Sequence, residues 1–256
     1  NTRSIDEYKA KFKKNSQTWD YLLAQNQYSA DIFKRAFYFD KEILTYGYPA
    51  NSILYSKNND IEINKLKDKF NLPKDKKIIL YSPTWRDNNF FQKGHYKMSL
   101  QLDLDYLFDN ISDDYIVILR LHYLISNSID ISKYEGFVYD FSGAYDIQEL
   151  YLVSDLNITD YSSTMFDYAN LKRPQLFFAY DLENYRDSLR GFYFELEEEA
   201  PGPIVKTNEE IAYWLNNIDN LNREYSDKIN TFYDKFCYID KEILTKNIID
   251  KIIDNN

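Results

Sequence analysis

Cysteine, histidine, glycine and proline are scarce in this chain. Its 256 residues include one cysteine, Cys237, two histidines, six glycines and six prolines. A single cysteine excludes an internal disulfide and any metal site built from several cysteines, and it fits a reducing compartment. No apolar run reaches about 18 residues and no signal-peptide pattern is present, so the sequence predicts no membrane-spanning helix.

Positive charge is also in short supply. The chain has 31 lysines and arginines against 41 aspartates and glutamates, which gives a formal net charge of −10. That balance argues against general nucleic-acid binding, which needs a basic face, but it leaves room for a local basic pocket around one phosphorylated ligand. With 44% hydrophobic and 18% aromatic residues, the composition is typical of a folded globular protein. Because the first residue is Asn1 and not methionine, we expect a piece of a longer protein.

Short apolar segments alternate with helical patterns in the middle of the chain. Strands are predicted at Ile78–Tyr81, Tyr115–Leu119, Gly136–Tyr139, Leu156–Ile158 and Gln175–Phe178, with helices near 101–110, 145–152 and 163–171. Strands separated by helices in this way indicate βαβ units. The predicted fold class is therefore α/β, with a doubly wound parallel sheet.

The two ends of the chain are mainly helical in pattern. Helices are expected at 29–37 and 60–71 and again from Asn208 onward, and strand-like pieces at Tyr21–Ala24 and Ile53–Tyr55. The hexapeptide Asp-Lys-Glu-Ile-Leu-Thr occurs twice, at 40–45 and at 240–245. Both copies are predicted to begin helices, because an aspartate can cap the helix and a glutamate follows in its first turn.

The segment Thr159–Asp167 has the pattern of a phosphate site. It follows a predicted strand and leads into a helix, whose first backbone N–H groups can bind an anion. Ser162 and Ser163 add hydroxyl donors, and Asp167, about one turn later, is placed to reach a ribose diol. The alternative is that the same residues form an ordinary helix N-cap.

Two further clusters follow predicted strands, at the sheet edge where open α/β folds bind ligands. After the strand at 78–81, Thr84 and Arg86 offer donors suited to phosphate; the alternative is a plain strand exit with a surface ion pair. After the strand at 115–119, Arg120 and His122 project to one face. The histidine is placed to protonate or hydrogen-bond a phosphate oxygen, with a structural role as the alternative.

A fourth cluster contains Arg186 and Arg190, each placed to reach a ligand. It precedes the acidic run Glu195–Glu199, which we interpret as a solvated surface and not as a metal site. No pair of aspartates with metal-ligand spacing lies beside a candidate pocket, so the sequence predicts no metal site.

Taken in order, these segments resemble one protein family. The matching segments are Trp19–Asn26, Gly47–Pro49, Ile79–Asp87, Leu119–His122, Ile158–Ser163, Phe166–Tyr168, Lys172–Pro174, Arg190–Phe192 and Ala200–Pro203. The chain resembles the CDP-glycerol glycerophosphotransferases, the teichoic acid polymerases and primases of Gram-positive cell walls. An ordered series over nearly the whole chain is more specific than any single motif.

The resemblance implies a GT-B enzyme, with two Rossmann-like halves and the active site between them. Residues 1–58 would be the end of an acceptor-side domain, 59–75 a linker helix, 76–235 the CDP-alditol-binding domain and 236–256 a helix that crosses back. Ser162 and Ser163 would hold the pyrophosphate, Asp167 the ribose, and the catalytic His122 would lie beside the transferred phosphate. The full set of residues expected to bind substrate is Thr84, Trp85, Arg86, Arg120, Asp160, Ser162, Ser163, Thr164, Asp167 and Arg190.

The implied reaction is in-line attack of a polyol hydroxyl on the β-phosphorus of CDP-glycerol or CDP-ribitol, with CMP leaving. The acceptor would be lipid-linked or polymeric, and no further cofactor is expected. The protein would work in the cytoplasm, at the inner face of the membrane. Lys9, Lys11, Lys13 and Lys14 form the one obvious basic patch for an anionic leaflet, with a solvated helix face as the alternative.

Two departures from the family pattern leave other functions open. The family has a Trp-His-Gly segment that would precede Asn1. Its Gly-Tyr-Pro-Arg-Asn-Asp motif has Ala50 and Ser52 here in place of the arginine and the aspartate. One alternative is a catalytically idle module that binds the nucleotide or the polymer. The other is a GT-B sugar transferase that uses a different nucleotide.

Overall fold

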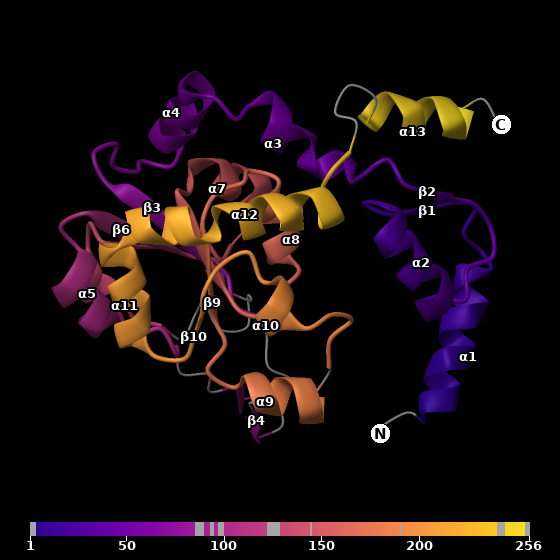
Figure 1. Ribbon diagram of the computed structural model, residues 1–256, viewed down its shortest axis with the longest axis horizontal. Helices are drawn as coiled ribbons and strands as arrows, with labels where there is room; N and C mark the ends of the chain where they lie inside the picture. Colours follow the sequence, from indigo (N-terminus) through magenta and orange to yellow (C-terminus); the bar gives the residue numbers. More distant parts are fainter. Residues whose placement is uncertain are drawn as a thin grey trace.

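A six-stranded parallel sheet forms the centre of the molecule (Figure 1). The computed structural model describes residues 4–84, 90–92, 95–96, 100–121, 129–143, 145–189, 191–239 and 244–253. The strands lie in the order β10-β9-β8-β3-β6-β7, and every neighbouring pair is parallel. Their bounds are β3 Lys77–Tyr81, β6 Tyr115–Leu119, β7 Val138–Asp140, β8 Leu156–Thr159, β9 Gln175–Phe178 and β10 Ile204–Val205. The five strands predicted from the sequence are confirmed.

The sixth strand, β10, has no counterpart among the predicted strands. It is two residues long, and Val205 pairs with Phe178 at the edge of the sheet. Two residues carry no readable periodicity, and the neighbouring prolines indicate a loop. Pairing with β9 makes the segment a strand, and only the tertiary fold supplies that partner.

The central strands are buried on both faces, which is why they read as continuous apolar runs. In β3, Ile79 and Tyr81 pack into one hydrophobic cluster, whereas Ile78 and Leu80 pack into the cluster on the opposite face. This alternation follows from the two-residue period of a strand. Each face must therefore be covered by helices.

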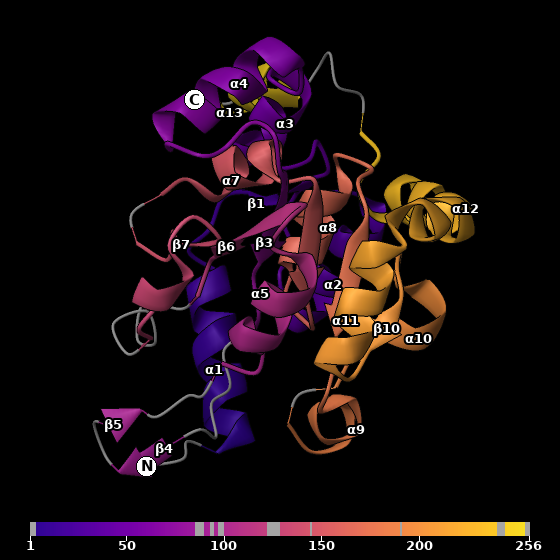
Figure 2. The same ribbon diagram turned by 90° about the vertical axis from the view of Figure 1, so that its left-hand side faces the viewer.

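Helices cover both faces, as Figure 2 shows. The first face carries α5 (Leu104–Ile111) and α11 (Asn208–Asn216), and the second carries α4 (Asp60–Lys69), α7 (Ile147–Val153) and α8 (Thr164–Ala169). The long α12 (Ile218–Phe236) packs against α8. Many of these helices begin where a side chain accepts a backbone N–H, at Asn59 for α4, Asp103 for α5, Asp146 for α7 and Thr207 for α11. The doubly wound architecture is confirmed.

Most of the N-terminal part lies at one end of the molecule, beyond α8 and α12, whereas its last helix packs against α7 (Figure 1). It consists of α1 (Ile5–Ser16), β1 (Leu22–Leu23), α2 (Gln27–Ala36), β2 (Ile43–Leu44), the 3₁₀ helix η1 (Pro49–Ser52) and α3 (Ile53–Ser56). Its strands β1 and β2 form a separate two-stranded parallel sheet.

Two predictions for this part are wrong. Residues 53–55, predicted to be strand-like, form helix α3. The first hexapeptide copy, predicted to begin a helix, instead contains β2, because Ile43 and Leu44 pair with Leu22 and Leu23. The strand pairing outweighs the local capping signal. In the second copy, residues 240–243 lie outside the described residues, and α13 (Leu244–Ile253) begins within it.

Hydrogen bonds tie the N-terminal part to the large sheet. Asn26 Nδ2 donates to the carbonyl oxygen of Lys235 at 2.8 Å, and Arg173 Nη2 donates to Asn58 Oδ1 at 2.7 Å. Helix α13 returns to the same region, where Lys251 Nζ lies 3.0 Å from Glu42 Oε1. Segments distant in sequence thereby join the N-terminal part to the elements around the sheet.

The remaining elements are short and lie mostly in loops. They are the strands β4 (Phe90–Gln92) and β5 (His95–Tyr96), the 3₁₀ helix η2 (Ser132–Tyr134), α9 (Leu182–Asn184), the π-helical turn η3 (Tyr185–Leu189) and α10 (Leu196–Glu199). Within the ranges given above, no helix combines the length and the apolar character that crossing a membrane requires.

Candidate functional site

The parallel sheet brings three of the predicted clusters to one edge. Strands β8, β3 and β6 are consecutive neighbours and run in the same direction. Their carboxyl ends therefore lead into Asp160, Ser82 and Arg120 at the same side of the sheet. This edge is where open α/β sheets bind ligands, and the sequence-based placement of the clusters is confirmed.

Asp160 joins two of the loops at this edge. Its Oδ1 accepts hydrogen bonds from the backbone N–H of Thr84 at 2.8 Å, from Thr84 Oγ1 at 2.6 Å and from the backbone N–H of Tyr161 at 2.6 Å. The side chain is only 2% exposed. A carboxylate used in this way fixes the two loops relative to each other, and the predicted contacts of Asp160 and Thr84 with substrate stay predictions.

The three hydroxyl residues that follow have different surroundings. Ser162 Oγ accepts from the backbone N–H of Thr164 at 3.3 Å. Thr164 Oγ1 points back to the sheet, 3.2 Å from both Ser82 Oγ and Thr159 Oγ1. Ser163 is the N-cap residue of α8, but its side chain makes no capping hydrogen bond, and it lines a cavity. Because α8 has only six residues, its helix dipole is small. An anion at this place would be bound mainly by hydroxyl groups and nearby backbone N–H groups.

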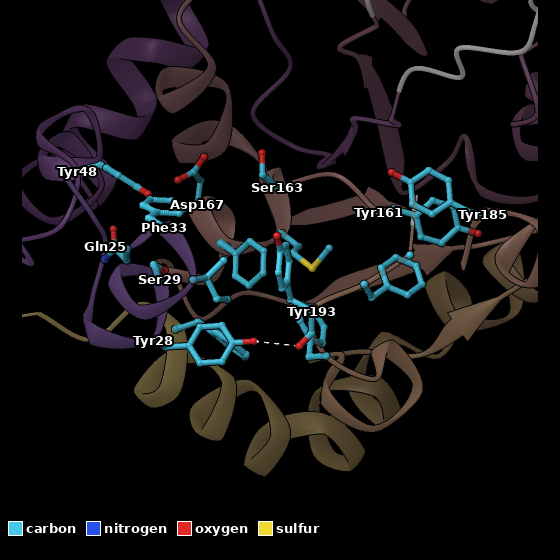
Figure 3. A pocket seen from close by; sticks show the side chains of 17 residues that line it. Gln25, Tyr28, Ser29, Phe33, Tyr48, Tyr161, Ser163, Asp167, Tyr185 and Tyr193 are labelled. Carbon is cyan, nitrogen blue, oxygen red and sulfur yellow. Dashed lines mark hydrogen bonds between the residues drawn. The ribbon is translucent and has the colours of Figure 1, made fainter. Parts of the chain in front are cut away.

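Asp167 lies on the same wall of the cavity, about one helical turn after Ser163 (Figure 3). Its Oδ1 accepts a hydrogen bond from Asn51 Nδ2, in η1, at 2.7 Å. Burial raises the pKa of the Asp167 carboxyl, and the hydrogen bond from Asn51 partly opposes that shift. Asp167 therefore presents a partly desolvated carboxylate, which suits hydroxyl donors such as those of a ribose.

Arg120 holds the loop that follows β7. Its Nη1 donates to the carbonyl oxygens of Phe141 at 2.8 Å and Gly143 at 2.5 Å, and its Nη2 donates to that of Tyr145 at 3.1 Å. Arg120 follows β6, and β3 lies between β6 and β8 in the sheet. The guanidinium is thus shown to support a loop at the edge, and the predicted contact with substrate stays a prediction.

Four predicted residues, Trp85, Arg86, His122 and Arg190, lie outside the described residues, and their assigned roles stay predictions. The acidic run keeps its surface interpretation, because Glu197 pairs with Arg186 at 3.0 Å and Glu199 pairs with Lys235 at 2.5 Å. Arg186 is therefore engaged away from the Ser163–Asp167 wall. In the described part of the chain, no cluster of His, Cys, Asp or Glu is arranged to hold a metal ion.

A cavity of about 480 Å³ opens beside Ser163 and Asp167 (Figure 3). Its other walls come from the N-terminal part, with Gln25, Tyr28 and Tyr48, and from the loop around η3, with tyrosine and phenylalanine side chains. The pKa of Tyr48 is raised by burial and by the negative charge of Asp167, against a hydrogen bond with the backbone of Gln25. The sequence reasoning assigned no role to Gln25, Tyr48 or Asn51. Gln25 lies in the family-like segment 19–26 and Tyr48 in the segment 47–49. Those two segments were the sequence signal that could have identified both residues.

Comparison with known proteins identifies the family. The family model described as CDP-Glycerol:Poly(glycerophosphate) glycerophosphotransferase matches residues 1–254. The chain is 50% identical over 245 residues to the teichoic acid poly(glycerol phosphate) polymerase of Bacillus subtilis strain 168, covering 96% of this chain and 33% of that protein. It is 33% identical over 201 residues to the teichoic acid poly(ribitol-phosphate) polymerase of Bacillus spizizenii strain W23, covering 77% and 32%.

The structure is similar to that of the wall teichoic acid polymerase TagF. A variant of TagF soaked with CDPG superimposes with a TM-score of 0.91 at 46% identity, covering 99% of this chain and 62% of that chain. The predicted GT-B type of α/β fold is thereby confirmed. The chain spans about a third of the curated B. subtilis relative and less than two thirds of the solved polymerase. The chain belongs to the CDP-glycerol:poly(glycerophosphate) glycerophosphotransferase family.

Proposed function

We propose that the protein containing this chain transfers glycerol phosphate from CDP-glycerol to a hydroxyl of a polymeric or lipid-linked acceptor and releases CMP. The observation that carries the proposal is the match over nearly the whole chain to polymerases, one of them solved after a CDPG soak. Glycerol is favoured over ribitol as the transferred unit, because identity is 50% to the glycerol phosphate polymerase and 33% to the ribitol-phosphate polymerase.

The site geometry supports a donor position along the carboxyl edge of the sheet. Ser162 and Ser163 would bind the diphosphate, and Asp167 the ribose diol on the same wall. Asp160 and Thr84 would hold the loop that presents the two serines. Catalysis of phosphoryl transfer rests on alignment and on neutralising charge, so such a rigid loop contributes directly.

The remaining residues complete the proposed donor site. Trp85, Arg86, Arg120, Thr164 and Arg190 would line it or support its loops, and His122 would lie beside the transferred phosphate. The acceptor oxygen attacks the β-phosphorus while the bond from that phosphorus to the CMP oxygen breaks. The acceptor hydroxyl releases its proton to solvent, and CMP leaves with the negative charge of the leaving oxygen. We propose that no metal ion is required. We also propose the division into 1–58 on the acceptor side, 59–75 as linker, 76–235 on the donor side and 236–256 as the returning segment.

The proposal is tested with the full-length protein, CDP-glycerol and a lipid that carries one glycerol phosphate unit. We expect CMP to appear in proportion to the glycerol phosphate incorporated, and excess EDTA to leave the rate unchanged. Binding of CDP without any CMP release would instead identify a catalytically idle module. Release that requires another nucleotide-linked donor would identify a sugar transferase, and loss of activity in EDTA would contradict metal-free catalysis.

We further propose that the protein works at the cytoplasmic face of the membrane, docked through α1. Lys9, Lys11, Lys13 and Lys14 are all exposed on α1. Beside them, Ile5 is 73% and Tyr8 is 56% exposed. Lysines next to exposed apolar side chains suit an anionic leaflet, whose attraction is about 1 kcal/mol for each basic residue near its surface.

Replacing these four lysines with glutamine should weaken binding to phosphatidylglycerol vesicles at least about 100-fold at low salt, measured by flotation. The control replaces the same number of lysines on and near α4, namely Lys57, Lys65, Lys67 and Lys69, and should bind as the unmodified protein does. Equal losses for both variants would show that net charge alone, and not this surface, governs binding.

A further inference from the structure

A row of side-chain hydrogen bonds connects the N-terminal part to α8 and the residues that follow it. Each bond joins a residue in or just after η1 and α3 to a residue in or just after α8. The pairs are Asn51–Asp167, Tyr55–Asn170 and Asn58–Arg173. Successive pairs are about one helical turn apart in both segments, so they lie along one side of each. The N-terminal part thus fixes the side of α8 that carries Asp167.

The Asn51 amide is bonded to a side chain at one end only. It is 2% exposed, and its Nδ2 donates to Asp167 Oδ1 at 2.7 Å. A carboxylate accepts only, so the amide nitrogen must be the atom that faces Asp167. At the other end, Asn51 Oδ1 is buried and has no partner in the described part of the chain. An unpaired buried acceptor is destabilising, and an apolar side chain would avoid that cost. Packing alone therefore does not favour asparagine here, whereas the bond to Asp167 does.

The two carboxylate oxygens of Asp167 have different surroundings. Oδ1 accepts the hydrogen bond from Asn51. Oδ2 has no hydrogen-bond partner among the described residues, and it is not one of the buried unpaired atoms found there. The half-buried Asp167 side chain lines the cavity, on the wall that Figure 3 shows with Ser163. Oδ2 therefore keeps accessible surface beside the cavity, where a ligand hydroxyl can donate to it.

We propose that Asn51 is a positioning residue of the donor site, which holds Asp167 Oδ1 so that Oδ2 accepts from the ribose diol of the nucleotide. The site thereby selects a nucleotide that carries the diol over one that lacks it. The inference rests on the proposed transferase function, in which Asp167 binds the ribose. Asn51 itself contacts neither the nucleotide nor the transferred phosphate.

Two physical effects make this arrangement selective. A carboxylate that is already held in one orientation loses little side-chain freedom when the nucleotide binds, so more of the hydrogen-bond energy appears as affinity. The bond from Asn51 also opposes the effect of burial on the pKa of the Asp167 carboxyl, and so favours the ionised form. An ionised carboxylate accepts from a hydroxyl more strongly than a neutral group does.

The test measures, by calorimetry on the full-length protein, the binding of CDP and of 2′,3′-dideoxy-CDP, which lacks the diol. The unmodified protein should bind CDP at least about tenfold more tightly. Asn51→Ala should lower the affinity for CDP about tenfold and that for the dideoxy nucleotide less than about twofold. Where alanine leaves the fold unstable, Asn51→Leu keeps a branched side chain in the space and should give the same two results.

Two further variants separate positioning from general damage to the interface. Asp167→Ala should abolish the preference for CDP, and adding Asn51→Ala to it should change the affinity for CDP less than about twofold, because both act through one contact. The matched control is Tyr55→Phe, which removes the neighbouring hydrogen bond to Asn170 and should keep the preference of the unmodified protein.

The outcomes that contradict the inference differ from those that contradict the proposed function. A preference for CDP that survives in Asn51→Ala would overturn the role of Asn51 and leave the donor site intact. Equal losses of affinity for the two nucleotides would make Asn51 a packing residue, and loss of the preference in Tyr55→Phe would assign it to the whole interface; either overturns the inference. Equal binding of both nucleotides by the unmodified protein would remove Asp167 from the ribose. An unmodified protein that binds no CDP would contradict the proposed function itself.

Discussion

Replacing His122 with alanine in the full-length protein is expected to lower kcat for CMP release by about 10²–10⁴-fold, the range typical of losing a positioned acid or base. His122 follows β6, and the carboxyl end of that strand lies two places from β8 in the sheet. The imidazole would stabilise or protonate a phosphate oxygen as the bond to CMP breaks. If the imidazole acts on the transferred phosphate as proposed, CDP binding should change less than about threefold.

The control for this variant is the other histidine, His95, whose replacement by alanine should leave kcat within about twofold. The dissociation constant for CDP adds a second readout, since it should stay within about threefold of the unmodified value in His122→Ala. Unchanged turnover in His122→Ala would remove the histidine from the mechanism. Equal loss of CDP binding and turnover would make it a donor-binding residue instead.

Replacing Asp160 with alanine should have the largest effect on stability among the site residues. The carboxylate accepts hydrogen bonds from two backbone N–H groups and one hydroxyl, at 2.6–2.8 Å, in a position 2% exposed. Removing it leaves those donors unpaired, so the free energy of unfolding should fall by about 3 kcal/mol. For a domain of this size the midpoint of thermal unfolding should fall by roughly 6–12 °C. The loop that carries Ser162 and Ser163 also loses its anchor, and CDP affinity should drop about tenfold.

The Asp160→Asn variant removes the negative charge of the side chain and keeps its shape, so it tests the two contributions separately. Asparagine keeps one oxygen in place to accept from Thr84 and Tyr161, so less than half of the stability loss is expected. Differential scanning calorimetry and CDP titration of both variants make the comparison. Equal losses for Asn and Ala would show that the negative charge, and not the hydrogen-bonded connection between the loops, sets the effect.

The strands of the large sheet could be read from the sequence because their signal is local. Ile78–Tyr81 and Tyr115–Leu119 are apolar at every position, as strands covered on both faces must be. The helices could be read for a similar reason, since residues such as Asn59 and Asp146 cap them where the pattern changes. Parallel strands then place their carboxyl ends together, so the sequence also predicted that Thr84, Arg120 and Ser162 share one edge.

The errors lie where a partner distant in the chain decides the outcome. Residues 40–45 carry a helix-start signal, yet Ile43 and Leu44 become a strand because Leu22 and Leu23 pair with them. Val205 becomes a strand only beside Phe178. In each case a few hydrogen bonds from another segment outweigh a propensity worth a few tenths of a kcal/mol per residue.

By itself, then, the sequence determined the α/β class and the family, and it predicted a phosphate-binding loop, because short apolar runs, caps and ordered motifs are properties of neighbouring residues. The tertiary structure alone decided how those residues are used. It showed that Asp160 connects two loops and that Arg120 supports a third, whatever contact either makes with a ligand. It also placed Gln25 and Asn51, over a hundred residues away, against the wall formed by Ser163 and Asp167. Such contacts depend on how distant segments pack, and no local pattern in the chain records them.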